Sequence, residues 1–137
     1  FGPRDGEIDR VIEQGAAAWF EEQITMDLRS YTSAWESIAA DFNDIDSGEN
    51  ANFRQLSHET FMLNALFSPD QLRQRMTYAL SQMFVISDRF DFAGHDELMM
   101  GYADTLHRNA FGNYRDLLRE VTLHPAMGMF LAMLGNE

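Results

Sequence analysis

Hydrophobic and polar residues recur along most of this chain with the spacing of an α-helix. In the clearest segments, apolar side chains return every three or four positions, which places them on one face of a helix. No segment alternates apolar and polar residues with period two between turn signals, the pattern of a half-buried strand. The sequence therefore predicts an all-α protein, an irregular bundle of about six to seven short helices in a single domain over residues 1–137.

Three helices and an acidic loop are predicted in the first part of the chain. The helices are expected at residues 3–14, 16–25 and 31–42. Ile8, Val11 and Ile12 share one face of the first helix, and Gly15 is placed to end it in the left-handed conformation. The segment 43–51 is polar and acidic, so we predict a mobile loop there.

The strongest helix signal follows Phe67. Ser68 is placed as an N-cap, Pro69 as the first helical residue and Gln71 as the side chain that closes a capping box. An N-cap Ser stabilises a helix by ~1 kcal/mol relative to Ala. This helix is expected to end near residue 87. Its buried stripe is predicted to consist of Leu72, Met76, Ala79, Leu80, Met83 and Phe84.

Four other helices are predicted from apolar spacing, one before this helix and three after it. The helix over residues 52–67 is expected to bury Phe53, Leu56, Thr60, Leu63 and Phe67, with Phe61 and Met62 beside them. The helix that begins at residue 95 or 96 is expected to bury Leu98, Met99, Tyr102, Ala103, Leu106 and Ala110. The two short helices after residue 112 are expected to bury Leu117, Leu118, Val121, Met127, Phe130, Leu131 and Leu134.

The charge of the chain narrows the range of its partners. The sequence holds 22 acidic and 10 basic residues, and its net charge is −12. This charge repels the phosphates of nucleic acids and anionic membrane surfaces, and it favours cationic partners. The apolar runs are far shorter than the roughly 20 residues that a membrane-spanning helix needs. We therefore expect neither a nucleic acid partner nor a membrane span.

Several segments of the chain resemble one bacterial protein family. They are DQLRQRMTYALSQMFVIS at residues 70–87, AFGNYRDLL at residues 110–118 and HPAMG at residues 124–128. These motifs are long and occur in order, and the opening residues Phe1-Gly2-Pro3 are also similar to the start of the family's first helix. The family is known only as a domain of unknown function, number eighteen hundred.

The resemblance implies a cellular context for the chain, but it implies no chemical reaction. Family members are usually several times longer than this chain, often carry export signals, and tend to be encoded beside proteins that resemble sulfatases and alkaline phosphatases. The chain is thus expected to be the N-terminal fragment of a larger, extracytoplasmic protein. Its expected partner is the remainder of its own chain, or a partner protein such as the sulfatase- or phosphatase-like neighbour. The family has no established catalytic residues to carry over.

His124, directly before Pro125, is the first of three candidate catalytic residues. An imidazole titrates near neutral pH and can act as a metal ligand or general base. The alternative is a structural role at a helix junction, in which His124 caps the preceding carbonyl groups. No second His lies three or four residues away, and His95 and His107 are too far apart along one helix to bind the same ion. With no Cys in the chain, we expect no metal site and no cofactor, haem included.

Arg75 and Arg115 are the other two candidates. Guanidinium groups bind sulfate or phosphate through forked hydrogen bonds. If these residues and His124 meet in one cleft, the chain is part of a hydrolase that acts on sulfated or phosphorylated polymers. The alternative is ion pairing, because Arg115 and Arg119 share a helix face and require acidic residues opposite them.

Two further groups of residues have both a structural and a functional interpretation. The carboxylates of Asp88, Asp91, Asp96 and Glu97 lack the spacing of a calcium-binding loop, and acidic residues at a helix start complement its dipole. Met residues are frequent in the second half, and they suit both irregular cores and binding surfaces. We therefore predict a helical packing and interaction module with an exposed apolar patch near Met129 and Met133.

Overall fold

Eight helices make up the part of the chain that the computed structural model describes, residues 2–45, 53–87 and 95–133. No strand occurs within these ranges. The helices are α1 (Glu7–Gln14), α2 (Ala16–Thr25), α3 (Tyr31–Ile45), α4 (Phe53–Phe67), α5 (Gln71–Met83), α6 (Asp96–Arg108), α7 (Tyr114–Leu123) and α8 (Pro125–Phe130). The predicted all-α bundle of short helices is confirmed.

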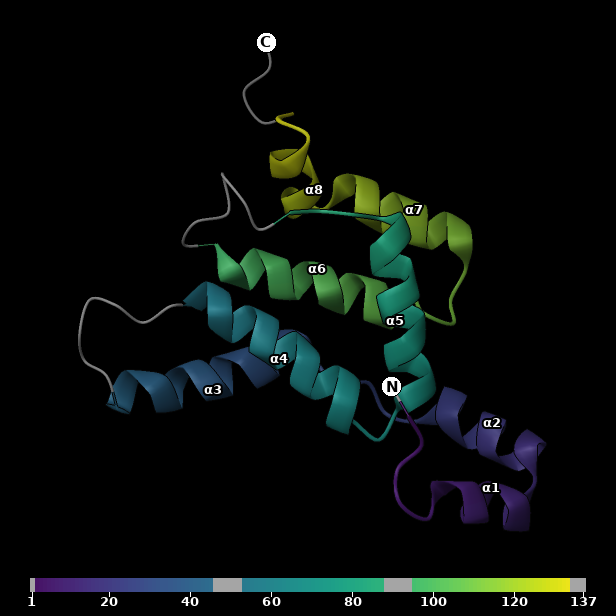
Figure 1. The fold of residues 1–137 in the computed structure, drawn as a ribbon. Helices are drawn as coiled ribbons and strands as arrows, with labels where there is room; N and C mark the ends of the chain where they lie inside the picture. The colour runs from purple at the N-terminus through teal and green to yellow at the C-terminus, as the bar shows by residue number, and fades with distance from the viewer. Residues whose placement is uncertain (1, 46–52, 88–94, 134–137) are drawn as a thin grey trace.

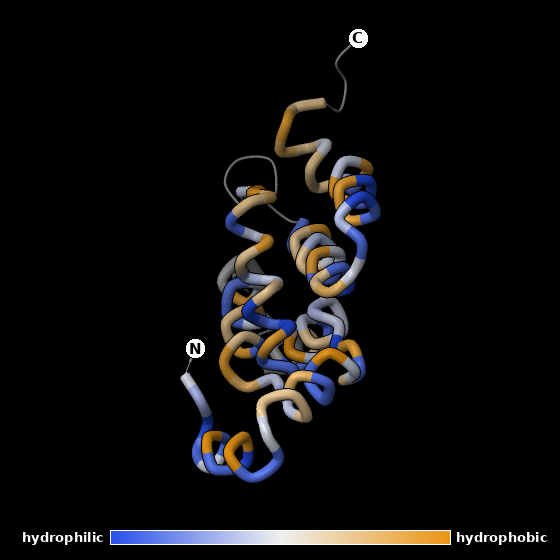
Figure 2. Tube along the Cα trace, turned by 90° about the vertical axis from the view of Figure 1, so that its right-hand side faces the viewer, coloured by the Kyte–Doolittle hydropathy of each residue, from blue (hydrophilic) through white to orange (hydrophobic). Residues whose placement is uncertain are grey.

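Helix α6 lies at the centre of the bundle and contacts α3, α4, α5, α7 and α8. Figure 1 shows α6 between the α3–α4 pair and the α7–α8 pair, with α5 crossing beside them. The α1–α2 hairpin projects from the end of the bundle where α4 passes into α5 (Figures 1 and 2). Among the described helices, the hairpin packs on the bundle only through α2 against α5.

The start of α3 is capped by a side chain of α6. The Asp104 carboxylate accepts hydrogen bonds from the backbone N–H groups of Tyr31 at 2.6 Å and Thr32 at 3.1 Å, and from Ser30 Oγ at 2.8 Å. The first N–H groups of a helix have no partner within the helix, and a negative charge there complements its dipole. This contact therefore fixes the first turn of α3 against α6 and places Tyr31 in the core.

Two apolar clusters form the core, and α6 contributes to both. One contains Leu80, Tyr102, Leu106, Leu117, Val121 and Ala126. The other contains Tyr31, Met100 and Ala103. The stripe predicted for α6 is confirmed by the burial of its residues Tyr102, Ala103 and Leu106, and of Ala110 just beyond its end.

Helix α5 differs from its predicted orientation. Of the predicted stripe only Leu80 is buried, whereas Met76 and Met83 are exposed. The residues that α5 buries are Gln71, Arg73, Gln74, Thr77 and Leu80. The prediction was wrong because it assumed an apolar inner face, and the structure instead places hydrogen-bonded polar side chains there.

Helix α4 shows the same reversal. It buries Leu56 and Thr60 as predicted, and also Ser57 and Ala65. Leu63 and Phe67 were predicted to be buried, but both are exposed, together with Met62 and Leu66. The inner face of α4 is thus small and partly polar, and its outer face carries large apolar side chains.

Three short elements also depart from prediction. Helix α1 buries none of its residues, and Ile8 and Ile12 are exposed. Gly15 ends α1 at φ 84° and ψ 149°, a positive φ as expected but outside the left-handed helical region. Leu118 of α7, and Phe130 of α8 with the adjoining Leu131, are exposed, not buried as predicted.

The acidic segment 43–51 was predicted to be a loop. Its first residues, 43–45, instead form the end of α3, and residues 46–51 lie outside the described part of the chain. The described helices include none with the length and apolar character that a membrane crossing requires.

Candidate functional site

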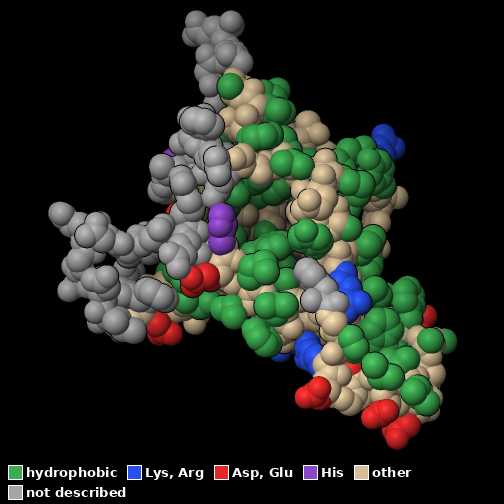
Figure 3. Space-filling model, in the orientation of Figure 1, with side chains coloured by type: hydrophobic (Ala, Val, Ile, Leu, Met, Phe, Trp, Pro, Cys, Tyr) green, Lys and Arg blue, Asp and Glu red, His purple; other side chains and the backbone are tan. Residues whose placement is uncertain are grey.

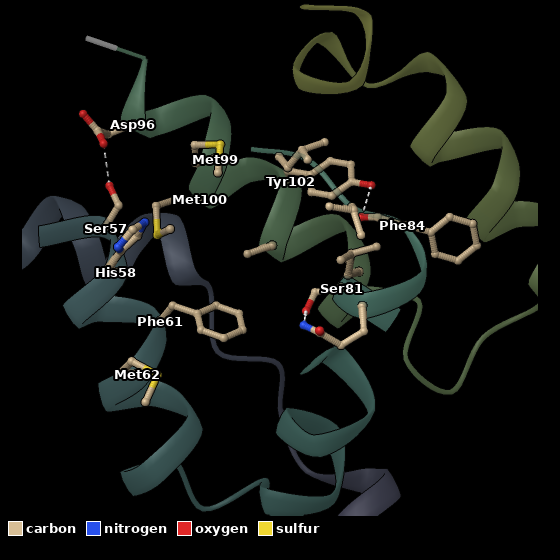
Figure 4. A pocket seen from close by; sticks show the side chains of 15 residues that line it. Ser57, His58, Phe61, Met62, Ser81, Phe84, Asp96, Met99, Met100 and Tyr102 are labelled. Carbon is tan, nitrogen blue, oxygen red and sulfur yellow. Dashed lines mark hydrogen bonds between the residues drawn. The ribbon is translucent and has the colours of Figure 1, made fainter. Parts of the chain in front are cut away.

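A pocket of about 430 Å³ lies between α4, α5 and α6. Figure 4 shows side chains from these three helices pointing into it, and Figure 3 shows the molecule hollowed at this place. Its apolar lining comes from Phe61, Met62, Phe84, Val85, Ile86, Met99, Met100, Tyr102, Ala103 and Leu106. A volume of this size and a mainly apolar wall are typical of small-molecule sites.

The polar residues of the pocket lie at two places on its edge. At one end, Ser57 Oγ of α4 donates a hydrogen bond of 2.8 Å to Asp96 Oδ1 in the first turn of α6, with His58 beside them (Figure 4). Ser81 of α5 lies across the pocket from this pair (Figure 4), and its neighbour Gln82 also lines the pocket. The centre between the two groups is apolar, so an occupant would meet hydrogen-bonding groups mainly at its ends.

Tyr102 holds the wall of the pocket in place. Its hydroxyl donates a hydrogen bond of 2.9 Å to the backbone carbonyl of Phe84, just after the last residue of α5. Burial raises the pKa of the Tyr102 phenol to about 12, so this group keeps its proton at neutral pH. Tyr102 therefore ties the end of α5 to α6 and serves as a hydrogen-bond donor, not as a base.

Phe61 connects the pocket to a buried polar network. Its ring stacks on Tyr31, with ring centroids 5.5 Å apart, and Tyr31 makes an edge contact of 5.3 Å with the His107 ring. The Tyr31 hydroxyl donates a hydrogen bond to Gln74 Oε1. Burial, with the nearby carboxylates of Asp70 and Asp104, raises the pKa of Tyr31, so it also stays protonated.

The centre of this network is a pair formed by Asp70 and His107. Asp70 Oδ2 lies 3.1 Å from His107 Nε2, and both side chains are almost completely buried. The other carboxylate oxygen of Asp70 accepts hydrogen bonds from Ser68 Oγ and from Gln74 Nε2, the latter at 3.1 Å. His107 Nδ1 lies 3.0 Å from the Thr77 hydroxyl.

The surroundings of Asp70 favour its charged form. Burial alone raises the pKa of a carboxyl group, but the hydrogen bonds from His107, Ser68 and Gln74 outweigh burial and lower the pKa of Asp70 to about 2. Asp70 is therefore a carboxylate throughout the physiological pH range. Its charge is compensated inside the bundle by the groups around it.

The same network explains why the predicted capping box is wrong. Asp70, not Ser68, is the N-cap residue of α5, and its side chain makes no capping bond because it is directed to His107. Gln71 does not close a box: its side chain donates hydrogen bonds to the carbonyl groups of Ser68 at 2.7 Å and Ala65 at 3.3 Å. The polar residues of this turn therefore serve tertiary contacts.

Arg73 extends the polar interior toward the α1–α2 hairpin. Its guanidinium donates to the Ile24 carbonyl at 3.1 Å and to the His107 carbonyl at 3.5 Å, and it lies 4.6 Å from the centre of the Phe111 ring. Burial lowers the pKa of Arg73. Its contacts join α2, α5 and the end of α6, so this Arg has a structural role.

The arrangement of Asp70, His107 and Thr77 resembles an acid–base relay, but its position argues against catalysis. None of the three side chains lines the α4–α5–α6 pocket, and all three are buried. The Thr77 hydroxyl also lies 2.8 Å from the Arg73 carbonyl, to which it donates within α5. These contacts hold α5 against α6 and give no substrate access to a nucleophile.

His124 occupies the helix junction and caps the preceding helix, as the structural alternative expected: it is the C-cap of α7, and its backbone N–H donates to the Val121 carbonyl at 3.2 Å. Its Nδ1 accepts a hydrogen bond of 3.2 Å from the backbone N–H of Ala126, so His124 is the N-cap of α8. Its ring makes an edge contact of 5.2 Å with Tyr102. Burial lowers the pKa of His124, although a hydrogen bond with the Gly101 backbone opposes this shift. The neutral imidazole is the form that suits both the hydrogen bond from Ala126 and the edge contact with Tyr102.

The structure places the three candidate catalytic residues at different parts of the described fold. His124 lines a hollow between α6 and α7 together with Arg108, Arg119 and Glu120. Arg75 lines a different hollow, formed with α1 and α2. Arg115 lines neither hollow. Its backbone N–H donates a hydrogen bond to the side-chain oxygen of Asn113, the N-cap of α7.

The ion pair that joins α6 and α7 uses other residues than the predicted Arg115 and Arg119. Arg108 donates to Glu120 Oε2 at 2.8 Å, and Asn109 donates to the same oxygen at 2.9 Å. The hydrogen bonds from Arg108 and Asn109 lower the pKa of Glu120. Among the described residues, no three His, Cys, Asp or Glu side chains form a group that could hold a metal ion.

Of the acidic cluster, Asp96 and Glu97 lie in the first turn of α6, where acidic residues complement the dipole. Asp88 and Asp91 lie outside the described residues.

Comparison with known proteins gives a family and no function. No curated protein and no solved structure matches the chain. The profile of the family described as "Protein of unknown function (DUF1800)" matches residues 1–137, the whole sequence. The chain therefore belongs to the DUF1800 family of proteins of unknown function.

Proposed function

We propose that this chain is a helical interaction module of a larger, exported bacterial protein, and that the outer faces of α4 and α5 pack against another part of that protein. The observation that carries the proposal is the reversed polarity of these two helices. Their inner faces bury polar side chains, which are hydrogen-bonded on α5, and their outer faces hold large apolar side chains.

The extent of the reversal is large. Thr60 and Thr77 have no exposed surface, whereas Phe67 and Met83 expose 69% and 63% of theirs. The large apolar side chains exposed on these two helices are Met62, Leu63, Leu66, Phe67, Met76, Tyr78 and Met83. Each Å² of apolar surface left in water costs about 25 cal/mol relative to burial, and large exposed patches mark interaction sites.

A second apolar region supports the same role. Leu131 and Met133, at the end of the described chain, are mostly exposed, in the region where the sequence predicted a patch. Met129 does not contribute as predicted, because it is partly buried against the core. Figure 3 shows hydrophobic side chains over much of the face viewed, from α7 to the α1–α2 hairpin.

The occupant that fits these faces best is a segment of the same protein. A covalently connected segment is present at a high effective concentration, which suits surfaces that expose large apolar side chains on two neighbouring helices. The net charge of −12 makes an anionic membrane surface a poor alternative. The tendency of family members to carry export signals supports a location outside the cytoplasm, which cell fractionation tests.

No specific observation favours a hydrolase that acts on sulfated or phosphorylated polymers. Its three candidate residues, His124, Arg75 and Arg115, do not share either of the cavities that His124 and Arg75 line. A role of the sulfatase- or phosphatase-like neighbour as a partner remains a prediction from the family resemblance.

Thiol labelling tests the proposed packing, because the chain has no Cys of its own. Phe67→Cys and Met83→Cys place thiols on the outer faces of α4 and α5, and Glu21→Cys is a control on the exposed surface of α2. The variants are prepared in the isolated 137-residue chain and in the intact protein purified from its native cells. We expect the first two thiols to react at least tenfold more slowly in the intact protein, and the control thiol to react equally in both.

Equal labelling of Phe67→Cys and Met83→Cys in both proteins would contradict the proposal. Concentration-dependent protection in the isolated chain would also overturn it, because a second copy would then be the occupant. Light scattering at the same concentrations identifies that case.

A further inference from the structure

The α4–α5–α6 pocket combines a negative group at one end with aromatic rings and thioethers in its interior. Asp96 lies at the end where α4 meets the first turn of α6 (Figure 4). Met99, Met100 and Phe61 follow toward the interior, and Tyr102 lies beyond them (Figure 4). Among the described residues no Arg side chain lines this pocket, and the sequence has no Lys; His58 lies beside Asp96 at the same end (Figure 4).

This distribution selects the charge of an occupant. A carboxylate attracts a cation and repels an anion, and the net charge of −12 acts in the same direction. The faces of aromatic rings also attract organic cations. The apolar wall requires that most of the occupant be hydrocarbon or aromatic, because an unpaired polar group placed there would lose its hydrogen bonds to water.

Met side chains make the wall adaptable. Met62, Met99 and Met100 contribute thioethers from two helices, and Met fills irregular spaces because its unbranched chain rotates easily. Such a wall accepts apolar groups of different shapes, whereas the hydrogen-bonded Ser57–Asp96 pair fixes the position of the charge. Selectivity is thus expected for charge more than for shape.

We propose that this pocket binds small amphipathic amines, with the ammonium group at Asp96 and the apolar body against Met99, Met100 and Phe61. The charge-selecting residue of this site lies on α6 and not on the outer faces of α4 and α5, and Met62 is shared by the pocket wall and the outer face of α4. Binding requires no covalent step and no cofactor.

The proposal is tested with three probes that have the same chain of eight carbons. Octylamine is protonated at pH 7, octanoate is negatively charged, and octan-1-ol is neutral. The purified chain is labelled with ¹³C at the Met methyl groups, and each probe is titrated below its micelle concentration. Met62, Met99 and Met100 report on the pocket, and the exposed Met133 reports on nonspecific binding.

We expect saturable shifts of the three pocket methyl groups with octylamine, and an affinity roughly fivefold to tenfold higher than with octanoate, with octan-1-ol between them. This ratio is the size expected when one partly exposed charge contact is gained by a cation and lost by an anion. Asp96→Asn should reduce the ratio to below about twofold, because Asn keeps a similar shape and removes the charge.

Glu97→Gln is the matched control, since Glu97 lies in the same first turn of α6 but does not line the pocket. It should leave the preference for octylamine unchanged. Ser81→Trp places a large ring at the opposite edge of the pocket and should weaken all three probes, with circular dichroism used to confirm that the variant is folded.

Three results would overturn the proposal. Equal affinity for octylamine and octanoate would show that the pocket does not select charge. An equal effect of Glu97→Gln and Asp96→Asn would assign the preference to the general negative potential. Shifts confined to Met133, or no saturable shift at all, would show that the pocket is not a binding site for these amines.

Discussion

At the scale of single residues, the least expected feature is a buried carboxylate at the centre of a polar network that connects three helices. Asp70 receives hydrogen bonds from Ser68 and Gln74, faces His107 of α6, and is connected through Gln74 to Tyr31 of α3. A buried charge is tolerated only when it is paired and hydrogen-bonded. The network therefore fixes the relative positions of α3, α5 and α6 more strictly than apolar contacts would.

The substitution Asp70→Asn tests this role. It removes the charge opposite His107 and is expected to lower the free energy of unfolding by roughly 3 kcal/mol at pH 7, the usual cost of breaking a buried pair. The matched control is Glu120→Gln, which weakens the exposed pair with Arg108 and should cost less than about 1 kcal/mol. Urea unfolding followed by circular dichroism measures both values.

The effect of Asp70→Asn also has a predictable pH dependence. The folded-state pKa of about 2 is lower than the ordinary value of 3.8, so the carboxylate stabilises the fold fully above pH 3.8. This contribution is lost as the pH falls from 3.8 toward 2. The difference between the native chain and the variant should therefore shrink in that range. A constant difference down to pH 2.5 would show that the charge of Asp70 is not what stabilises the fold.

At the scale of helices, α5 shows that the buried face of a helix need not be its most hydrophobic face. Leu80 is its only buried apolar residue, and Met83, three positions later, is mostly exposed. We expect Leu80→Ala to lower the free energy of unfolding by roughly 3 kcal/mol, because it opens a cavity in the core. Met83→Ala should change it by less than about 0.5 kcal/mol, as surface substitutions usually do.

The pair of variants is measured by thermal and urea unfolding, with binding of an apolar dye as a second readout. Met83→Ala should lower dye binding by the folded chain. If Met83→Ala destabilises the chain as much as Leu80→Ala, the outer face of α5 is buried in the isolated protein, and the proposed packing face is wrong.

The helices also show how far the sequence predicts this fold. The apolar stripe of α6 was correct because that helix is central and meets apolar neighbours on several sides. The buried stripe predicted for α5 was wrong. Gln71, Gln74 and Thr77 are polar residues at helical spacing, a pattern that normally indicates the solvent-exposed face of a helix. Periodicity gives the faces of a helix, but the choice of the inner face here depends on partners from distant parts of the chain, such as His107 and Tyr31.

The candidate site was less predictable than the helices. Residues of the pocket had other roles in the sequence interpretation: Asp96, for example, was placed at a helix start and Phe61 beside a buried stripe. The pocket exists only where α4, α5 and α6 meet, and no local motif marks that meeting. His124 was correctly placed at a junction, but its acceptor role toward Ala126 and its contact with Tyr102 depend on the tertiary structure.

At the scale of the whole molecule, the α1–α2 hairpin is connected to the bundle by few contacts. Gln23 is the central one: its side chain donates to the Pro69 carbonyl at 3.1 Å and accepts from the Leu72 backbone N–H at 3.0 Å. Arg73 adds its bond to the Ile24 carbonyl. Because α1 buries no residue, the hairpin can open without exposing the main core.

Hydrogen exchange measured by mass spectrometry should resolve this hairpin as a separate unit. In the native chain, α1 and α2 are expected to exchange faster than α6, which is packed on several sides. Gln23→Ala removes both hydrogen bonds to the start of α5 and should speed exchange in α1 and α2 several-fold while α6 stays unchanged. Gln14→Ala, which removes only a contact with Glu22 inside the hairpin, is the matched control and should leave the docking intact. If Gln23→Ala accelerates hydrogen exchange in α6 as much as in α1 and α2, the hairpin and the bundle unfold together. The polar contacts of Gln23 and Arg73 would then couple α2 to the Asp70–His107 network.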